Sequence, residues 1–182
     1  MNRSFTILGC MALICVAPIP ALAQDSVAIG GSVGVYVPTD SATRDALGSS
    51  WFSWGIGPVQ ISSANGRRVS SDLGFLIRKN GGNKLFMLRP TMGFSQSFGD
   101  PTKTSAVPYV ALRTGPAYAD YSITRFGVYS SDKKIGWNGN VELGVVFNQV
   151  FAISARYDVM SKFNDYNFNG WTLSARFQIA RF

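Results

Sequence analysis

The chain has 182 residues and a formal net charge of +7, with 15% charged and 13% aromatic residues. It contains no histidine, and both cysteines, Cys10 and Cys15, lie in an apolar N-terminal stretch. Residues 24–182 therefore cannot form disulfides or use a thiol in catalysis. They also lack histidine, the side chain that serves most often as a general base and as a metal ligand.

The N-terminus predicts a secretory signal over residues 1–23. Arg3 precedes an apolar run over 5–19, and Ala21-Leu22-Ala23 forms a small-residue cleavage site. A lipoprotein site ending on Cys10 is rejected because too few residues separate it from Arg3 to form the apolar region. The run is also too short for a membrane-spanning helix, which needs about 20 residues. We therefore expect one mature domain over 24–182.

The mature part shows the two-residue alternation of apolar and polar side chains that is typical of strands. Val141, Leu143, Val145 and Phe147 share one face, for example. The pattern divides the domain into eight expected strands, over 26–37, 51–62, 67–79, 84–98, 106–118, 138–148, 150–160 and 170–182. Most of these are long enough to cross a bilayer when tilted.

The connections alternate in length. Long ones are expected over 38–50, 119–137 and 161–169, with Lys133 and Lys134 in the longest, and short ones at 63–66, 81–83 and 148–149. With both termini on one side, the three long connections share the opposite side, as in outer-membrane barrels. The first long connection also contains ATRDAL, a candidate short helix capped by Ser41 that would lie over the barrel mouth.

Aromatic residues support the same fold class. All four tryptophans lie at expected strand ends beside the long connections and would form an aromatic girdle, while phenylalanines and Tyr109 would gather at the other rim. The girdle residues are Trp51, Trp54, Trp137 and Trp171. The predicted fold is an all-β, eight-stranded, antiparallel, up-and-down transmembrane β-barrel.

The whole mature chain resembles the small outer-membrane β-barrels of the outer-membrane protein A, X and W families, on strand pattern and its terminal Phe182 rather than on a short motif. The resemblance implies that the last strand, with Phe177, Ile179 and Phe182, acts as a signal for the barrel-assembly machinery. Phe182 is out of phase with Ile179, which a bulge near Arg181 or a position at the rim would explain. Outer-membrane enzymes of this kind use a histidine, so we expect no enzymatic activity.

If the apolar faces meet lipid, the opposite faces line the lumen. An eight-stranded barrel is just wide enough for its own side chains, and buried charges must be paired. The expected lumen network consists of Asp72, Arg89, Arg113, Glu142, Arg156, Asp158 and Arg176. This predicts a closed, ion-paired lumen, and a narrow anion-preferring pore for small solutes is the first alternative.

Three further expectations concern ligands. Arg78, Lys79 and Lys84 surround a short outer hairpin and are candidates for contact with lipopolysaccharide phosphates, or are simply solvated. DYNFNG at 165–170 matches half of a calcium loop, but Arg176 stands where a glutamate is required, so we favour an ordinary outer loop. We expect no cofactor, no metal and no nucleic-acid partner.

The sequence thus predicts a structural or adhesive outer-membrane protein, expected as a monomer in the lipid of a Gram-negative-type envelope. A soluble lipocalin-like barrel that binds a lipophilic ligand is the second alternative.

Overall fold

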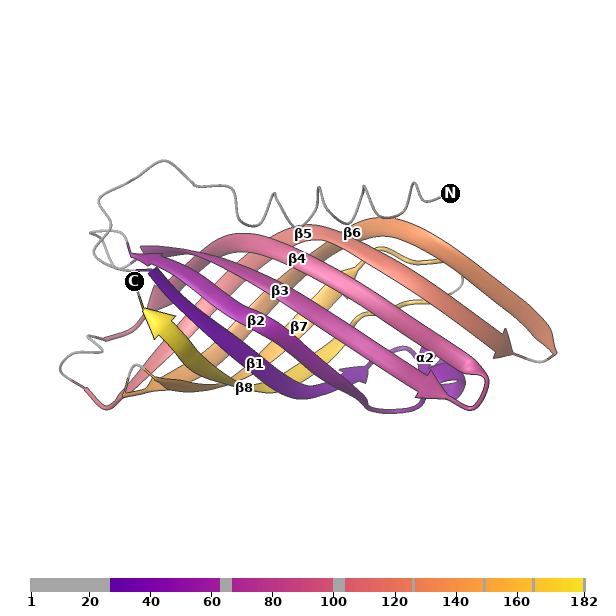
Figure 1. Cartoon of the computed structure of the whole chain (residues 1–182), viewed down its shortest axis with the longest axis horizontal. Helices are drawn as coiled ribbons and strands as arrows, with labels where there is room; N and C mark the ends of the chain where they lie inside the picture. Colours follow the sequence, from indigo (N-terminus) through magenta and orange to yellow (C-terminus); the bar gives the residue numbers. More distant parts are fainter. Residues whose placement is uncertain are drawn as a thin grey trace.

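The computed structural model describes residues 27–62, 67–99, 104–125, 127–148, 150–164 and 166–181. The expected signal over 1–23 lies outside them. The chain forms one closed barrel in which each strand pairs with its neighbours in sequence and β1 pairs with β8, every pair antiparallel (Figure 1). The eight-stranded up-and-down β-barrel that the sequence predicts is therefore confirmed.

The elements are β1 (Val27–Pro38), α2 (Ser41–Leu47), β2 (Trp51–Ser62), β3 (Arg67–Asn80), β4 (Asn83–Ser97), β5 (Ala106–Arg125), β6 (Val128–Phe147), β7 (Phe151–Met160) and β8 (Gly170–Arg181). Six strands end within one residue of the expected positions. Because β1 begins beside the end of β8, we call this the terminal end of the barrel and the opposite one the α2 end. In the described chain, no helix is both long and apolar enough to cross a membrane.

The expected long loop over 119–137 is wrong. β5 and β6 have 20 residues each and stay paired as far as Arg125 and Val128, so Lys133 and Lys134 lie on β6. In the β5 part of this extension Ala119, Tyr121 and Ile123 point inward and are buried, while the outward side chains of Asp120, Ser122 and Thr124 are polar. Polar outward residues gave no sign of a lipid-facing strand, which is why the extension was missed.

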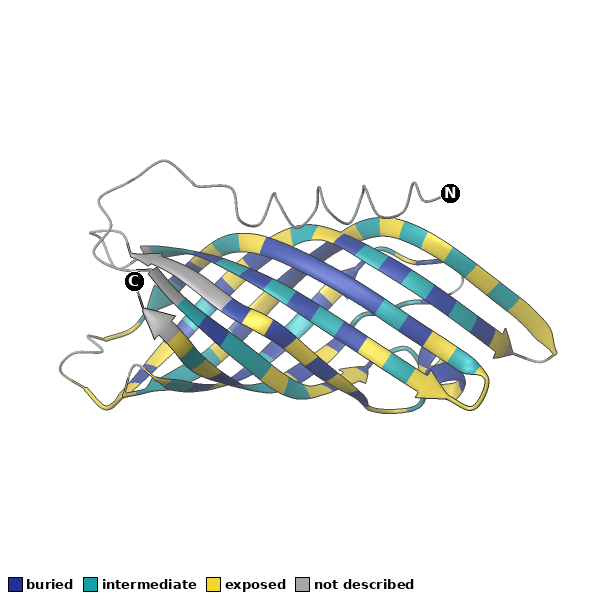
Figure 2. Cartoon of the chain, viewed as in Figure 1, coloured by how far each residue is buried: buried dark blue, intermediate teal, exposed yellow. Residues whose placement is uncertain are grey.

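Burial alternates along most of the strands, as the bands in Figure 2 show, but residues 87–91 of β4 are all buried. Apolar side chains such as Leu112, Leu143 and Leu173 are exposed on the outward face, and small, polar or charged ones fill most of the inside. The inside has two parts. Charged residues occupy the middle of the barrel, and apolar ones, including Tyr36, Leu47 and Trp51, pack together at the α2 end.

Candidate functional site

All seven side chains of the expected lumen network lie inside the barrel, and none is more than 6% exposed. They come from β3 to β8 and lie on the inward face of their strands, as the two-residue period predicts. The structure brings them together in two adjoining clusters.

The first cluster surrounds Glu142 on β6. Its Oε2 accepts hydrogen bonds from Nη1 of Arg113 (2.7 Å) and Nη2 of Arg176 (2.6 Å), and its Oε1 accepts one from the Tyr109 hydroxyl. Nε of Arg113 donates to Oγ of Ser70 at 2.9 Å. The Glu142 carboxylate thus joins β5, β6 and β8, and Arg113 extends the cluster to β3.

The second cluster contains two carboxylates and two arginines. Arg156 on β7 donates from Nη1 to Oδ2 of Asp72 at 2.6 Å and from Nε to Oδ2 of Asp158 at 3.1 Å. The Nη1 of Arg89 lies 2.9 Å from Oδ2 of Asp158, close enough for an ion pair, although its N–H groups are not aligned for a hydrogen bond. The hydroxyl of Thr172 also donates to that oxygen, at 3.2 Å. The charges in this cluster balance.

Sequence reasoning missed the neutral partners of these charges, namely Ser70, Tyr109 and Thr172. Placing Tyr109 at the rim was wrong: its ring is 7% exposed and lies inside, over Gly144 on the next strand. A Cβ at Gly144 would come within 2.6 Å of the ring, so only glycine leaves room for it. The sequence could have shown this, because Tyr109 and Arg113 are an even number of residues apart on one strand and therefore lie on the same, inward face.

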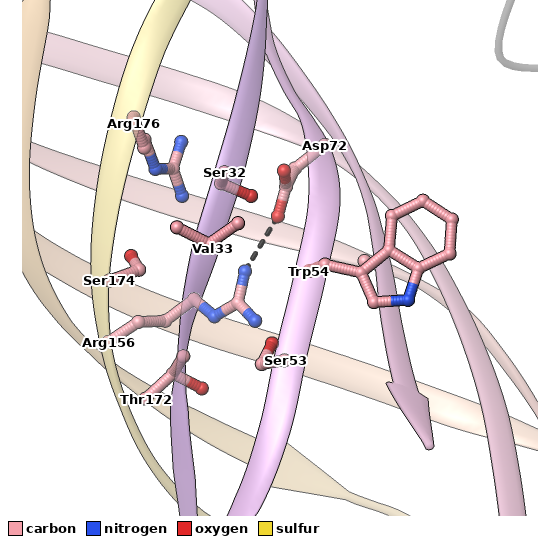
Figure 3. Close-up of a pocket in the computed structure, with 10 residues that line it drawn as sticks. Ser32, Val33, Ser53, Trp54, Asp72, Arg156, Thr172, Ser174 and Arg176 are labelled. Carbon is pink, nitrogen blue, oxygen red and sulfur yellow. Dashed lines mark hydrogen bonds and ion pairs between the residues drawn. The ribbon is translucent and has the colours of Figure 1, made fainter.

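A small cavity of about 10 Å³ lies beside these clusters, which is about the room that one water molecule needs. Arg156, Arg176 and Asp72 line it, together with several hydroxyl groups, while Trp54 points away on the other side of its strand (Figure 3). The interior at this level is therefore packed with side chains.

The α2 end is closed by apolar packing. α2 lies at this end of the barrel (Figure 1), and the buried residues around it include side chains from the strands and from the 161–169 loop. Its N-cap is Asp40 instead of the expected Ser41, because the Asp40 carboxylate accepts from the backbone N–H (2.9 Å) and the hydroxyl (2.8 Å) of Thr43. The Thr43 hydroxyl in turn donates to the carbonyl of Asn167. The helix is thereby fixed to a second loop.

Three side chains hold the last turn of α2. Arg78 donates from Nε to the carbonyl of Leu47 and Asn83 donates from Nδ2 to that of Ala46, both at 2.7 Å. Trp51 donates from Nε1 to the carbonyl of Gly48 at 2.8 Å. Capture of these carbonyls satisfies acceptors that a helix end leaves without partners.

The aromatic girdle needs one correction. Trp54, Trp137 and Trp171 are 37%, 50% and 51% exposed on the outward face, but Trp51 is 1% exposed and packs inside against Tyr36. Trp51 lies on the inward face of β2, and its indole N–H donates to the Gly48 carbonyl just after α2. Outward rings gather near both ends, with Trp171 against Tyr157 towards the α2 end and Phe151 against Phe177 towards the terminal end.

The three basic residues near the β3–β4 hairpin have different environments. Arg78 is engaged with α2, whereas Lys79 and Lys84 are exposed and lie directly opposite each other across the two strands. Like charges at opposite positions repel, so this pair is a better candidate for an anionic ligand than Arg78.

Two other expected features fall partly outside the described residues. Phe182 is outside them, while Phe177 and Ile179 are exposed on the outward face of β8. The β1–β8 register shifts between Gln178 and Ala180, so Ile179 is an extra residue two positions before the expected bulge at Arg181. Asp165 of the calcium-like segment is also outside, and the Asn167 and Asn169 side chains accept local backbone N–H groups.

No protein-family model matches this chain, and no curated protein matches its sequence. Solved structures do match. Neisserial surface protein A (NspA) is 14% identical, with a TM-score of 0.60 over 85% of this chain and 97% of that one. Ail, the attachment invasion locus protein of Yersinia pestis, is 17% identical, with a TM-score of 0.58 over 87% and 99%. The N-terminal barrel of Pseudomonas aeruginosa OprF is also 17% identical, with a TM-score of 0.53 over 86% and 98%.

At these identities the likeness concerns the fold, and it agrees with the closed antiparallel sheet, its strand order and its apolar outward face. The chain has the fold of the small eight-stranded outer-membrane β-barrels.

Proposed function

We propose that this protein is a non-enzymatic barrel of a Gram-negative-type outer membrane, with a closed lumen, and that it acts through contacts made by its α2 end. The outward apolar belt with aromatic rings towards both ends supports a position in lipid. The absence of histidine throughout the sequence supports a function other than catalysis by the enzymes that use this residue. Phe177, Ile179 and Phe182, near the C-terminus of the chain, would serve assembly.

The closed lumen is supported by how the interior is filled. Ion pairs cross its middle, a cavity beside them has room for about one water, and apolar side chains pack below α2. A pore would need a continuous wet path, and a lipophilic ligand would need an apolar cavity of several hundred Å³. The filled interior therefore supports neither a pore nor a barrel that binds a lipophilic ligand as well as it supports a closed lumen. Planar-bilayer recordings of the purified barrel should show no steady openings, and stable unitary currents would contradict closure.

The observation that carries the adhesive part of the proposal is the free edge of β6. β6 pairs with β7 only from Asn138 onward, and beyond this the backbone of Trp137 exchanges hydrogen bonds with Ser161. The side chain of Lys134 still contacts Asn164, but the backbone from Val128 to Ile135 has no strand partner on that side in the described ranges. The backbone N–H and C=O of Trp137 both face this edge. Because alternate residues of a strand direct these groups to the same side, residues 129, 131, 133 and 135 face it as well. Such an edge can add a strand from another protein.

The edge is only partly blocked. Oδ1 of Asp132 accepts from the backbone N–H of Lys133 at 2.8 Å, which removes one donor from it. Charged side chains at such edges also discourage unspecific pairing. The backbone groups of the neighbouring Ser131 and Tyr129 remain available for hydrogen bonds to an incoming strand. Ail, a protein of the same fold, is named for attachment and invasion, and a role of that kind fits this use of the α2 end.

Replacement of Ser131 by proline tests this proposal, because it removes an edge N–H that β5 does not use. Bacteria that display the wild-type barrel should attach to epithelial cell layers more than bacteria that display the variant do. Gly82→Ala, in the exposed β3–β4 hairpin, is the control, and heat-modifiable migration checks that all barrels fold. Equal attachment by Ser131→Pro and wild type would contradict a role for the edge.

Lys79 and Lys84 support a second contact, with lipopolysaccharide. Each lies two residues along its strand, on the same face, from an outward apolar residue, Ile77 for Lys79 and Phe86 for Lys84. A phosphate there would reach both ammonium groups and offset their repulsion. Added lipopolysaccharide should raise the unfolding temperature of the wild-type barrel more than that of the Lys79→Ala/Lys84→Ala variant. The same rise in both would contradict the contact.

A further inference from the structure

The cavity beside Arg176 combines positive charge with donors that lack partners. Arg176 is 6% exposed and uses Nη2 for Glu142, while its Nε and Nη1 are buried and have no hydrogen-bond partner among the described residues. Ser32 lies directly opposite Arg176 on the paired strand, and its hydroxyl lines the same cavity. The site is therefore rich in N–H and O–H groups that can point at a bound group.

The charge of the lining decides which kind of group fits. Arg156 and Arg176 carry two positive charges, and Asp72 one negative charge that is already paired with Arg156 at 2.6 Å. A cation would be repelled by the unpaired guanidinium edge. A water molecule would satisfy hydrogen bonds, including one to the free Oδ1 of Asp72, but it would leave the charge unchanged.

The excess charge lies in the cluster that borders the cavity. Arg113 and Arg176 share the single carboxylate of Glu142, whereas the Asp72–Arg156–Asp158–Arg89 cluster is balanced. The charged side chains that are buried in the described interior thus carry one surplus positive charge. An uncompensated buried charge costs several kcal/mol, and an anion next to Arg176 would remove that cost.

The size of the cavity limits the anion to a single atom. About 10 Å³ holds about one water-sized group, so a sulfate, phosphate or carboxylate does not fit. Hydroxyl groups of Ser32, Ser53 and Ser174 surround the space together with the two guanidinium groups (Figure 3). We propose that this cavity binds one halide ion, chloride under physiological conditions, as a structural counter-ion of the lumen.

The proposal is tested on the purified full barrel in zwitterionic micelles. Chloride replaces gluconate, which is too large for the cavity, at constant ionic strength. Because chloride binds the folded barrel, the unfolding temperature should rise with its concentration and then level off in the form expected for one site. Bromide should act in the same way, and crystals soaked in bromide should show an anomalous peak between Arg156 and Arg176.

Variants distinguish the site from a general salt effect. Ser32→Ala and Ser53→Ala remove hydroxyl donors but no charge, so both should fold and need a higher chloride concentration for the same shift. Arg176→Gln should abolish the shift. Lys133→Gln, whose exposed side chain lies outside the cavity, should respond like wild type. Equal unfolding temperatures in chloride and gluconate, or a chloride response unchanged in the serine variants, would overturn the proposal in favour of bound water.

Discussion

Arg156 and Asp72 form an ion pair across the lumen, with 2.6 Å between Nη1 and Oδ2, although they are 84 positions apart in sequence. The pair joins β7 to β3, two strands that are not neighbours in the sheet. Such a contact ties opposite walls of the barrel together and occupies the space through which a solute would pass.

Arg156→Ala should lower the free energy of unfolding by about 3–5 kcal/mol, because it leaves the buried Asp72 and Asp158 without their shared partner. Urea titration of the barrel in lipid vesicles, followed by heat-modifiable migration, measures this loss. Lys133→Ala is the matched control, since it breaks only an exposed pair with Asp120 and should cost no more than about 1 kcal/mol. Similar losses in the two variants would contradict the cross-lumen pair.

Gly144→Ala should destabilise the barrel by about 1–3 kcal/mol through overpacking. The new Cβ would lie 2.6 Å from the Tyr109 ring and 2.7 Å from the backbone oxygen of Ile153, which cannot move aside cheaply. Gly82→Ala, with no atom within 4 Å of its new Cβ, should have little effect. The same urea titration compares them, and an unaffected Gly144→Ala barrel would show that Tyr109 does not pack there.

Arg78→Ala should loosen α2, because it removes the donor to the Leu47 carbonyl and leaves that helix end less well held. Limited trypsin digestion measures the effect, since Arg44 lies within α2 and a helix that opens exposes it to cleavage. The Lys79→Ala barrel, altered at the next residue, should be cut at the wild-type rate. If Arg78→Ala is cut no faster than this control, the contact does not hold the helix.

Single-tryptophan barrels in brominated phospholipid should separate Trp51 from Trp171. Trp171 is half-exposed on the outward face, so bromine should quench its fluorescence strongly, whereas Trp51 lies inside and should be quenched little. A barrel that keeps only Trp137 serves as a second outward control. Strong quenching of Trp51 would restore it to the girdle that the sequence suggested.

Local patterns determined which face of each strand turns inward. The two-residue period in the β6 and β7 sequences placed Glu142, Arg156 and Asp158 inside without further information, because successive strand residues must point to opposite faces. The same period set the number of strands and most of their ends. The same period also puts Tyr109 and Trp51 on the inward face. For these two residues it is a better guide than the tendency of aromatic side chains to gather at membrane interfaces.

Pairing partners were decided only by the tertiary structure. Nothing in the sequence links Arg156 to Asp72 or Arg113 to Glu142, because such pairs depend on how the strands stagger around the closed barrel. The length of the β5–β6 hairpin could not be predicted either, because it also depends on distant contacts. Ala119, Tyr121 and Ile123 are buried by α2 and the 161–169 loop, which close this end of the barrel. The sequence therefore determined the orientation of side chains, which is local, and the closed sheet determined their contacts, which are not.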